Sequence, residues 1–116
     1  MQKRYRNYLM NFKILPTPPF VRELKKLAKK HLSLKDDLRL LVAELAANPN
    51  YGTPLGNNCY KIRLAISSKN KGKSGGARII TYVRVVNETV YLLSIYDKSE
   101  LDNISDNDLT SRIKDL

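Results

Sequence analysis

The apolar residues of this chain change their spacing once, near residue 59, and no other feature of the sequence restricts the fold as strongly. Before this point they recur at helical spacing in two stretches, Phe20 to His31 and Leu34 to Leu45. After it, apolar and polar residues alternate, first from Tyr60 to Ser67. A period of 3.6 residues predicts amphipathic helices, and a period of two predicts half-buried strands. The chain is therefore expected to form two helices and then a sheet.

Local signals set the ends of the expected elements. Thr17 and Pro18 suit the cap and first turn of the first helix. Ser33 is expected to cap the second helix, with Asp36 completing a capping box, and Asn48-Pro49 is expected to end it. Strands are expected over residues 11–15, 60–67, 77–86 and 90–96, followed by a helix capped by Ser105. The predicted fold is α+β in the order βααβββα, a small antiparallel sheet with the two N-terminal helices on one face and a short C-terminal helix.

Length and cysteine content narrow the class of protein. With 116 residues the chain can bury a core of its own, and we expect one domain over residues 12–116 after an extension, disordered or helical, over residues 1–11. No stretch approaches the ~18 apolar residues of a membrane span, and no signal-peptide pattern opens the chain, so a cytoplasmic protein is expected. A single cysteine, Cys59, and a single histidine, His31, are interpreted as structural residues. No metal site and no cofactor is expected.

Positive charge is concentrated in the middle of the chain. The net charge is +10, from 21 Lys and Arg against 11 Asp and Glu. Residues 45–87 carry 7 basic and no acidic side chains, compared with 11 and 4 before them and 3 and 7 after them. Since a solvated surface normally mixes both signs, this segment predicts contact with an anion, most commonly phosphate. The simpler alternative is a basic protein whose loops are also basic.

Strand alternation predicts a basic sheet face. Lys61 and Arg63 are two residues apart, about 6.6 Å along a strand, which approximates the spacing of adjacent phosphates. The candidate residues of this face are Lys61, Arg63, Arg78, Tyr82, Tyr96 and Lys98. Such a face can hold an RNA backbone by charge and stack a base on Tyr82. For any single tyrosine a half-buried core position is the alternative, and for Lys61 and Arg63 it is an ordinary solvated strand.

The glycine-rich segment GKSGGAR is not a nucleotide-binding P-loop, because Ser67 stands where that motif requires its first glycine. We interpret Gly75-Gly76 as part of a hairpin loop whose amides, with Lys73, can close over a phosphate. The other expected RNA-binding residues are Lys69 and Lys71 in this loop and Lys25 and Lys29 on the first helix.

Three segments, YKIRLA, GKSGGARII and LLSIYDKSE, together resemble the RelE/ParE superfamily of bacterial toxins, most closely the HigB-like branch of RelE-type mRNA interferases. The likeness spans about residues 12–112. It implies a type II toxin that enters the ribosomal A site and cleaves mRNA through attack of a ribose 2′-OH on the adjacent phosphate. It also implies contacts with 16S ribosomal RNA and a cognate antitoxin, a helix-turn-helix protein of the HigA type.

The resemblance also implies roles for single residues. Lys61 and Arg63 match the paired bases of the family's second strand, and Arg78 matches the arginine that stabilises the transition state. Lys98 falls near another basic active-site residue. No residue matches the tyrosine that acts as general acid in some members, so Tyr96 is the substitute candidate. The catalytic histidines of certain HigB proteins have no counterpart here.

Two other functions are compatible with the same fold. One is a ParE-like inhibitor of gyrase without nuclease chemistry, and the other is an RNA- or ribosome-binding protein without catalysis. The basic set Lys61, Arg63, Arg78 and Lys98 favours the nuclease, because ParE-like toxins typically lack it.

Overall fold

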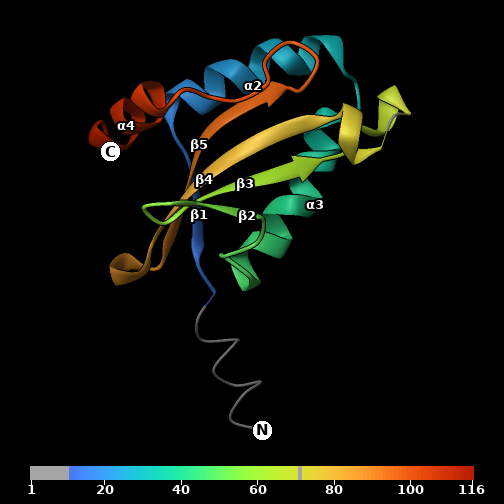
Figure 1. Cartoon of the computed structure of the whole chain (residues 1–116). Coiled ribbons are helices and arrows are strands. Elements are labelled where there is room, and N and C mark those ends of the chain that lie inside the picture. Colours follow the sequence, from blue (N-terminus) through green and yellow to red (C-terminus); the bar gives the residue numbers. More distant parts are fainter. Residues whose placement is uncertain (1–10, 71) are drawn as a thin grey trace, which may run out of the picture.

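A five-stranded sheet forms the centre of the molecule in the computed structural model, which describes residues 11–70 and 72–116 (Figure 1). The strands are β1 (Lys13–Pro16), β2 (Thr53–Gly56), β3 (Cys59–Leu64), β4 (Ala77–Arg84) and β5 (Thr89–Asp97). Their order across the sheet is β1-β5-β4-β3-β2. β1 runs parallel to β5, and the other neighbours are antiparallel. β1 is the first strand in sequence and pairs with the last, β5, so this edge of the sheet is formed by residues that are far apart in sequence.

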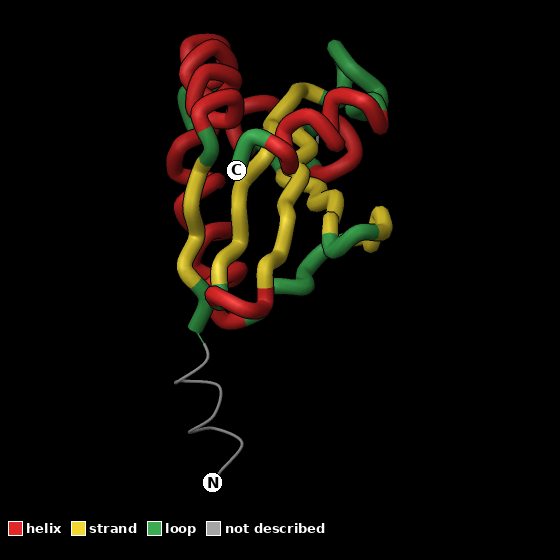
Figure 2. Tube along the Cα trace, turned by 90° about the vertical axis from the view of Figure 1, so that its left-hand side faces the viewer, coloured by secondary structure: helices red, strands yellow, loops and turns green. Residues whose placement is uncertain are grey.

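Helices α2 (Pro18–Lys30) and α3 (Leu34–Ala47) cover one face of the sheet (Figure 2). Their buried stripes, with Phe20, Leu34 and Leu45 among them, pack against Ile79 and Ile95 of the central strands. On the other face, α4 (Asp106–Lys114) packs on a smaller apolar group made by Cys59, Ile80, Leu93 and Tyr96. The predicted α+β fold, its two N-terminal helices and its C-terminal helix are confirmed.

The sheet has one strand more than predicted. No strand is predicted between Asn48-Pro49 and Tyr60, but Thr53–Gly56 pairs with β3 as an exposed edge strand. Pro54 is tolerated there because an edge strand leaves one side without ladder bonds. Gly56, Asn57 and Asn58 all adopt positive φ and turn the chain into β3. Turn-forming residues therefore obscured a strand that is only four residues long.

Thr17 and Ser33 occupy the N-cap positions of α2 and α3 as expected, but neither hydroxyl makes the predicted capping bond. Thr17 precedes α2, but its hydroxyl donates to the Leu92 carbonyl oxygen at 2.9 Å instead of capping, and Pro follows in the first turn, where it has no N–H to offer. Ser33 makes no side-chain cap either: its hydroxyl donates to Asp37 Oδ2 at 2.8 Å. The Ser105 cap is confirmed, since Asp108 N–H donates to its hydroxyl oxygen at 3.1 Å.

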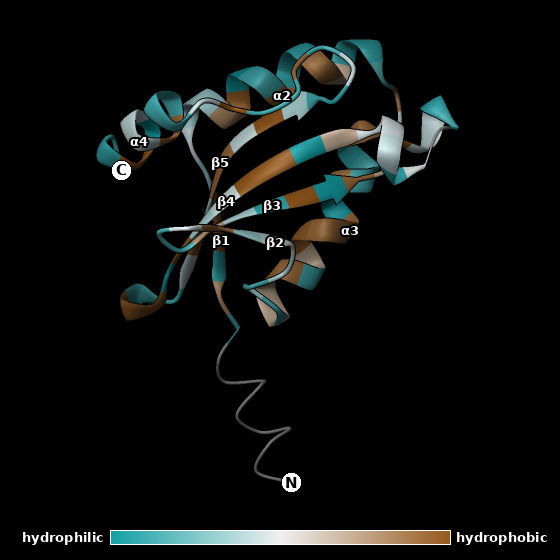
Figure 3. Ribbon diagram, in the orientation of Figure 1, coloured by the Kyte–Doolittle hydropathy of each residue, from teal (hydrophilic) through white to brown (hydrophobic). Residues whose placement is uncertain are grey.

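Short turns shorten two of the expected strands. A 3₁₀ turn, η1 (Ser67–Lys69), follows β3, and another, η3 (Val85–Asn87), follows β4. The η3 turn exposes Val85 and Val86 and is the brown hook at the lower left of Figure 3. The expected extension, residues 1–11, lies outside the described residues apart from Asn11. No helix in the described part of the chain is long and apolar enough to cross a membrane.

Candidate active site

The strand register brings several predicted residues onto the side of the sheet away from α2 and α3. Arg63 pairs with Arg78 across β3 and β4, and Arg78 pairs with Tyr96 across β4 and β5. Directly paired residues point to the same side of a sheet, and Lys61 shares that side because it lies two residues from Arg63. Lys98 follows the end of β5. This side, the basic face, therefore carries Lys61, Arg63 and Lys98 as the alternation of the sequence indicates.

Both lysines of the basic face are held by the segment that follows β5. Lys61 Nζ donates to Asn103 Oδ1 at 2.9 Å, and Lys98 Nζ donates to the Asp102 carboxylate. The hydrogen bond and charge of Lys98, assisted by the charge of Lys61, lower the pKa of Asp102. Asp102 is 84% exposed, so water competes strongly for this pair. The lysines are therefore available to another anion.

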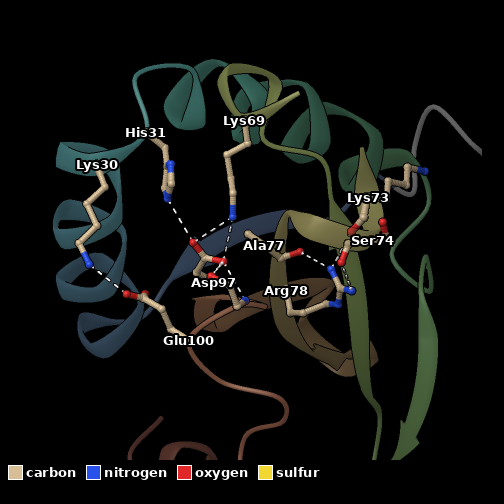
Figure 4. Close-up of polar contacts among 10 residues, drawn as sticks. Lys30, His31, Lys69, Lys73, Ser74, Ala77, Arg78, Asp97 and Glu100 are labelled. Atoms are coloured by element: carbon tan, nitrogen blue, oxygen red, sulfur yellow. Dashed lines mark hydrogen bonds and ion pairs between the residues drawn. The ribbon is translucent and has the colours of Figure 1, made fainter. Parts of the chain in front are cut away.

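Arg78 is buried under the basic face. The residue is only 4% exposed. Its guanidinium donates to the carbonyl oxygens of Lys73 at 2.9 Å, Ala77 at 3.1 Å and Ser74 at 3.4 Å (Figure 4). These acceptors belong to the turn η2 (Lys73–Gly75) and its junction with β4. The carbonyl dipoles stabilise a positive charge that would otherwise face the like charge of Arg63 directly.

Lys73 lies on the exposed surface of η2 and, together with Arg63, lines a hollow of about 250 Å³. Asp37, Glu44 and Tyr51 line the same hollow from the α3 side. The glycine-rich segment is thus a connection between β3 and β4, as interpreted from the sequence, and its Lys73 shares a hollow with Arg63.

Tyr96 is buried beneath the start of α4. Its ring lines a hollow of about 190 Å³ together with Lys61, Asn103 and Ile104. Burial raises the pKa of Tyr96, although the nearby Ile104 main chain and the charge of Arg78 oppose the shift. Among the described residues no group meets the hydroxyl with hydrogen-bond geometry. The phenol therefore keeps its proton at neutral pH, but its hydroxyl is enclosed by the protein.

Lys69 does not join the basic face. Its ammonium group lies 3.1 Å from Asp97 Oδ1, and its side chain is only 16% exposed. Asp97 also lies 3.2 Å from Nε2 of His31, at the end of α2 (Figure 4). Burial alone would raise the pKa of Asp97, but hydrogen bonds from Ser99 and Lys69 outweigh it and lower that pKa to about 2. His31 thus belongs to a polar cluster around the buried Asp97, in agreement with a structural interpretation.

Tyr82 belongs to an aromatic cluster near the other end of β4. Its ring stacks on Tyr91 with centroids 6.2 Å apart, and the Arg84 guanidinium lies 5.7 Å and 5.5 Å from the two ring centroids. Sequence reasoning missed Tyr91 and Arg84. The spacing of two between Tyr82 and Arg84 could have indicated the second of them, because it places both on one side of β4.

The remaining predicted RNA-binding residues lie elsewhere. Lys25 and Lys29 line a shallow hollow of about 360 Å³ on the helical side of the molecule, with Leu32 and Lys35. Lys71 lies outside the described residues.

A sheet with two helices on one side, and basic side chains beside a short third helix on the other, defines a small α+β protein with a basic face. The chain belongs to the RelE toxin family: residues 19–114 match the family described as "RelE toxin of RelE / RelB toxin-antitoxin system".

Two solved structures are similar in fold. The free-state structure of an arginine double mutant of the E. coli toxin RelE aligns with a TM-score of 0.60 and 18% identity, over 91% of this chain and 98% of that one. The crystal structure of the isolated E. coli RelE toxin aligns with a TM-score of 0.59 and 18% identity, over 90% and 99% of the two chains.

Proposed function

We propose that this protein is a ribosome-dependent endoribonuclease of the HigB-like branch, which cleaves mRNA in the A site. Its membership of a toxin family supports this proposal. The observation that carries it is the strand register, which places Lys61 and Arg63 on the side of the sheet opposite α2 and α3, with Lys98 directly after the end of β5. Such an enzyme acts in the cytoplasm on translating ribosomes. A HigA-like antitoxin, acidic at its contact surface, would neutralise it.

The proposed reaction needs no metal ion, since the RNA supplies the nucleophile. The ribose 2′-oxygen attacks the adjacent phosphorus, a 2′-O–P bond forms, and the P–O5′ bond breaks to leave a cyclic phosphate and a free 5′-hydroxyl. In this scheme Lys61 acts as a neutral amine and receives the 2′-OH proton to become an ammonium ion, while Arg63 and Lys98 stabilise the charge that develops on the phosphate. Tyr96, whose raised pKa keeps it protonated, is the candidate donor to the leaving oxygen, and because its hydroxyl is buried the segment that covers it has to move for this step.

Primer extension on an mRNA undergoing translation in a purified system tests the proposal. The wild type should produce cuts in register with codons. Lys61→Ala and Arg63→Ala should each lower the cleavage rate about 100-fold, in line with the loss of one proton-transfer or charge-stabilising group. Lys13→Ala is the matched control: it removes one positive charge from β1, at the opposite edge of the sheet, and should cleave normally.

The alternatives predict other outcomes. A ParE-like toxin would inhibit supercoiling by gyrase and leave translated mRNA intact. A non-catalytic binder would associate with ribosomes without producing cuts. Absence of codon-positioned cuts with the wild type, or equal loss in Lys13→Ala, would refute the nuclease proposal.

A further inference from the structure

The turn at the end of the β3–β4 connection is fixed by contacts to its backbone. Gly76 N–H donates to the Lys73 carbonyl oxygen at 3.4 Å, and Lys98 N–H donates to the Gly76 carbonyl oxygen at 3.1 Å. A Cβ atom at Gly76 would lie only 2.1 Å from the Leu64 carbonyl oxygen, so the turn rests directly on the end of β3. The Arg78 guanidinium also donates to the Lys73 carbonyl oxygen and to one further carbonyl oxygen of the turn, that of Ser74.

These contacts leave Arg78 poorly placed to bind a substrate. At 4% exposure it offers little surface to an RNA phosphate. Turning the guanidinium outward would break its bonds to the carbonyl groups of Lys73, Ala77 and Ser74. Such a loss is costly for buried polar groups, particularly when the donor is charged. The residue that the turn presents to solvent is Lys73, which lines one hollow with the exposed Arg63.

We propose that Arg78 is a positioning residue: it holds the Lys73–Gly76 turn so that Lys73, beside Arg63, contacts an RNA phosphate, and it makes no phosphate contact of its own. This inference rests on the proposed function, which makes RNA the ligand. It departs from the role expected for Arg78 from the family resemblance. Arg78 acts through the turn, and the charge that meets the phosphate belongs to Lys73.

The salt dependence of RNA binding distinguishes the two roles. The probe is a single-stranded RNA with 2′-O-methyl groups, which cannot be cleaved by 2′-OH attack. Each lost phosphate contact lowers the slope of log affinity against log salt by about 0.7 for a single strand. Lys73→Ala should lower the slope by about 0.7, and Arg78→Gln should lower it by no more than that. The double variant should match Lys73→Ala alone, because both changes remove the same contact.

Gly76→Ala provides a second way to displace the turn without removing any charge. Its methyl group cannot fit against Leu64, so this variant should reduce the slope as Arg78→Gln does and have no further effect in the Lys73→Ala background. Arg78→Lys, which keeps the charge and can still donate to one or two of the carbonyl groups, should restore part of the affinity. Thermal unfolding shows which variants are folded. If Arg78→Gln is unfolded, the slope measured for Gly76→Ala decides between the two roles.

The outcomes separate this inference from the proposed function. A slope about 1.4 lower in the Arg78→Gln, Lys73→Ala double variant would show that Arg78 binds a phosphate itself, and would overturn the inference alone. A full slope in Gly76→Ala, with a reduced slope in Arg78→Gln, would do the same. No RNA binding by the wild type would contradict the proposed function and this inference together.

Discussion

At the scale of single residues, the candidate site is occupied by its own chain. Asp102 neutralises Lys98, and Asn103 accepts a hydrogen bond from Lys61. A carboxylate and an amide oxygen thus take positions in which phosphate oxygens could bind the same ammonium groups. Because Asp102 is exposed, solvent and salt weaken its ion pair with Lys98. Asp102 therefore competes only weakly with an RNA phosphate for Lys98.

Removing the charge of Asp102 should strengthen RNA binding. Asp102→Asn is expected to raise the affinity for a 2′-O-methyl RNA about twofold to fivefold at low salt, a range typical of losing an exposed competing ion pair. Fluorescence anisotropy measures this directly. Asp115→Asn makes the same change in net charge at the end of α4 and should leave the affinity unchanged. An equal gain in both variants would assign the effect to net charge alone.

Tyr96 allows catalysis and stability to be separated. Its hydroxyl is buried without a hydrogen-bond partner among the described residues, so removing it should cost no stability. Tyr96→Phe is expected to leave the free energy of unfolding unchanged or to raise it by up to about 1 kcal/mol. If Tyr96 is the proton donor, cleavage should fall about 100-fold in the same variant. Urea unfolding and primer extension test the two parts, and a destabilised variant would show that the hydroxyl does have a hydrogen-bond partner.

At the scale of elements, α4 is fastened to the rest of the molecule by Arg112. Its guanidinium donates to both carboxylate oxygens of Glu23 on α2, at 2.9 Å and 2.8 Å, and to the Leu93 carbonyl oxygen at 2.7 Å. Leu93 lies where the register between β4 and β5 shifts, so this carbonyl group is one that a bulge removes from the regular ladder. The surrounding carboxylates, Glu23 first, raise the pKa of Arg112.

Breaking this anchor should destabilise the fold. Arg112→Ala is expected to lower the free energy of unfolding by about 3 kcal/mol, because it leaves the Leu93 carbonyl group without the Arg112 donor and the Glu23 carboxylate with the Ile95 N–H but no positive partner. Arg39→Ala is the control, since its pair with Asp36 is exposed on both sides and should contribute less than about 0.5 kcal/mol. Urea denaturation compares the two variants. Similar losses would show that the Arg112 contacts contribute no more than a surface pair.

Elements with a regular apolar stripe were predictable from the sequence, whereas those held by single contacts were not. The stripes of α2 and α3 and the alternation in β3 to β5 persist over several turns or residue pairs, so packing and local pattern agree. β2 has Pro and Gly in a four-residue stretch and is a strand only because β3 lies beside it. The Ser33 cap failed because Asp37, which also binds the Ser67 N–H, takes the Ser33 hydroxyl.

The candidate site shows the same division. Parity along the strands is enough to place Lys61, Arg63 and Arg78 on one side of the sheet. Parity cannot show that Arg78 bends under a turn or that Lys69 crosses to Asp97, because both depend on contacts made after the loops have folded. Nor does the sequence predict that Asp97 is buried, because an aspartate at the end of a strand and next to a lysine is normally exposed.

At the scale of the whole molecule, the Asp97 cluster joins parts that are distant in sequence. It links the end of α2 through His31, the turn after β3 through Lys69, and the end of β5. The carboxylate has a pKa of about 2 in the folded chain against 3.8 for an unperturbed aspartate. A lowered pKa stabilises the fold at pH values above the unfolded pKa, and this contribution is lost as the pH falls through the folded pKa.

The stability that Asp97 contributes should therefore disappear in acid. The difference in free energy of unfolding between the wild type and Asp97→Asn is expected to be constant from about pH 6 to 7 and to shrink by about 2 kcal/mol between pH 5 and 2. Urea midpoints across this range measure it. Glu100→Gln, which removes an exposed pair with Lys30, should show almost no difference at any pH. A difference for Asp97→Asn that does not change with pH would contradict the role given to its charge.

The parallel pairing of β1 with β5 also governs the time course of folding. Lys13 pairs with Thr89, 76 positions later, so the strand synthesised first must wait for the one synthesised last. The hairpins that join β3 to β4 and β4 to β5 close shorter loops and are expected to form earlier. Phe12 packs with Val83 of β4 and Val90 of β5, so its apolar contacts are complete only after β5 has been synthesised. The basic residues Lys61, Arg63 and Arg78 are therefore synthesised before β5, and the sheet that arranges them is complete only once β5 has been made.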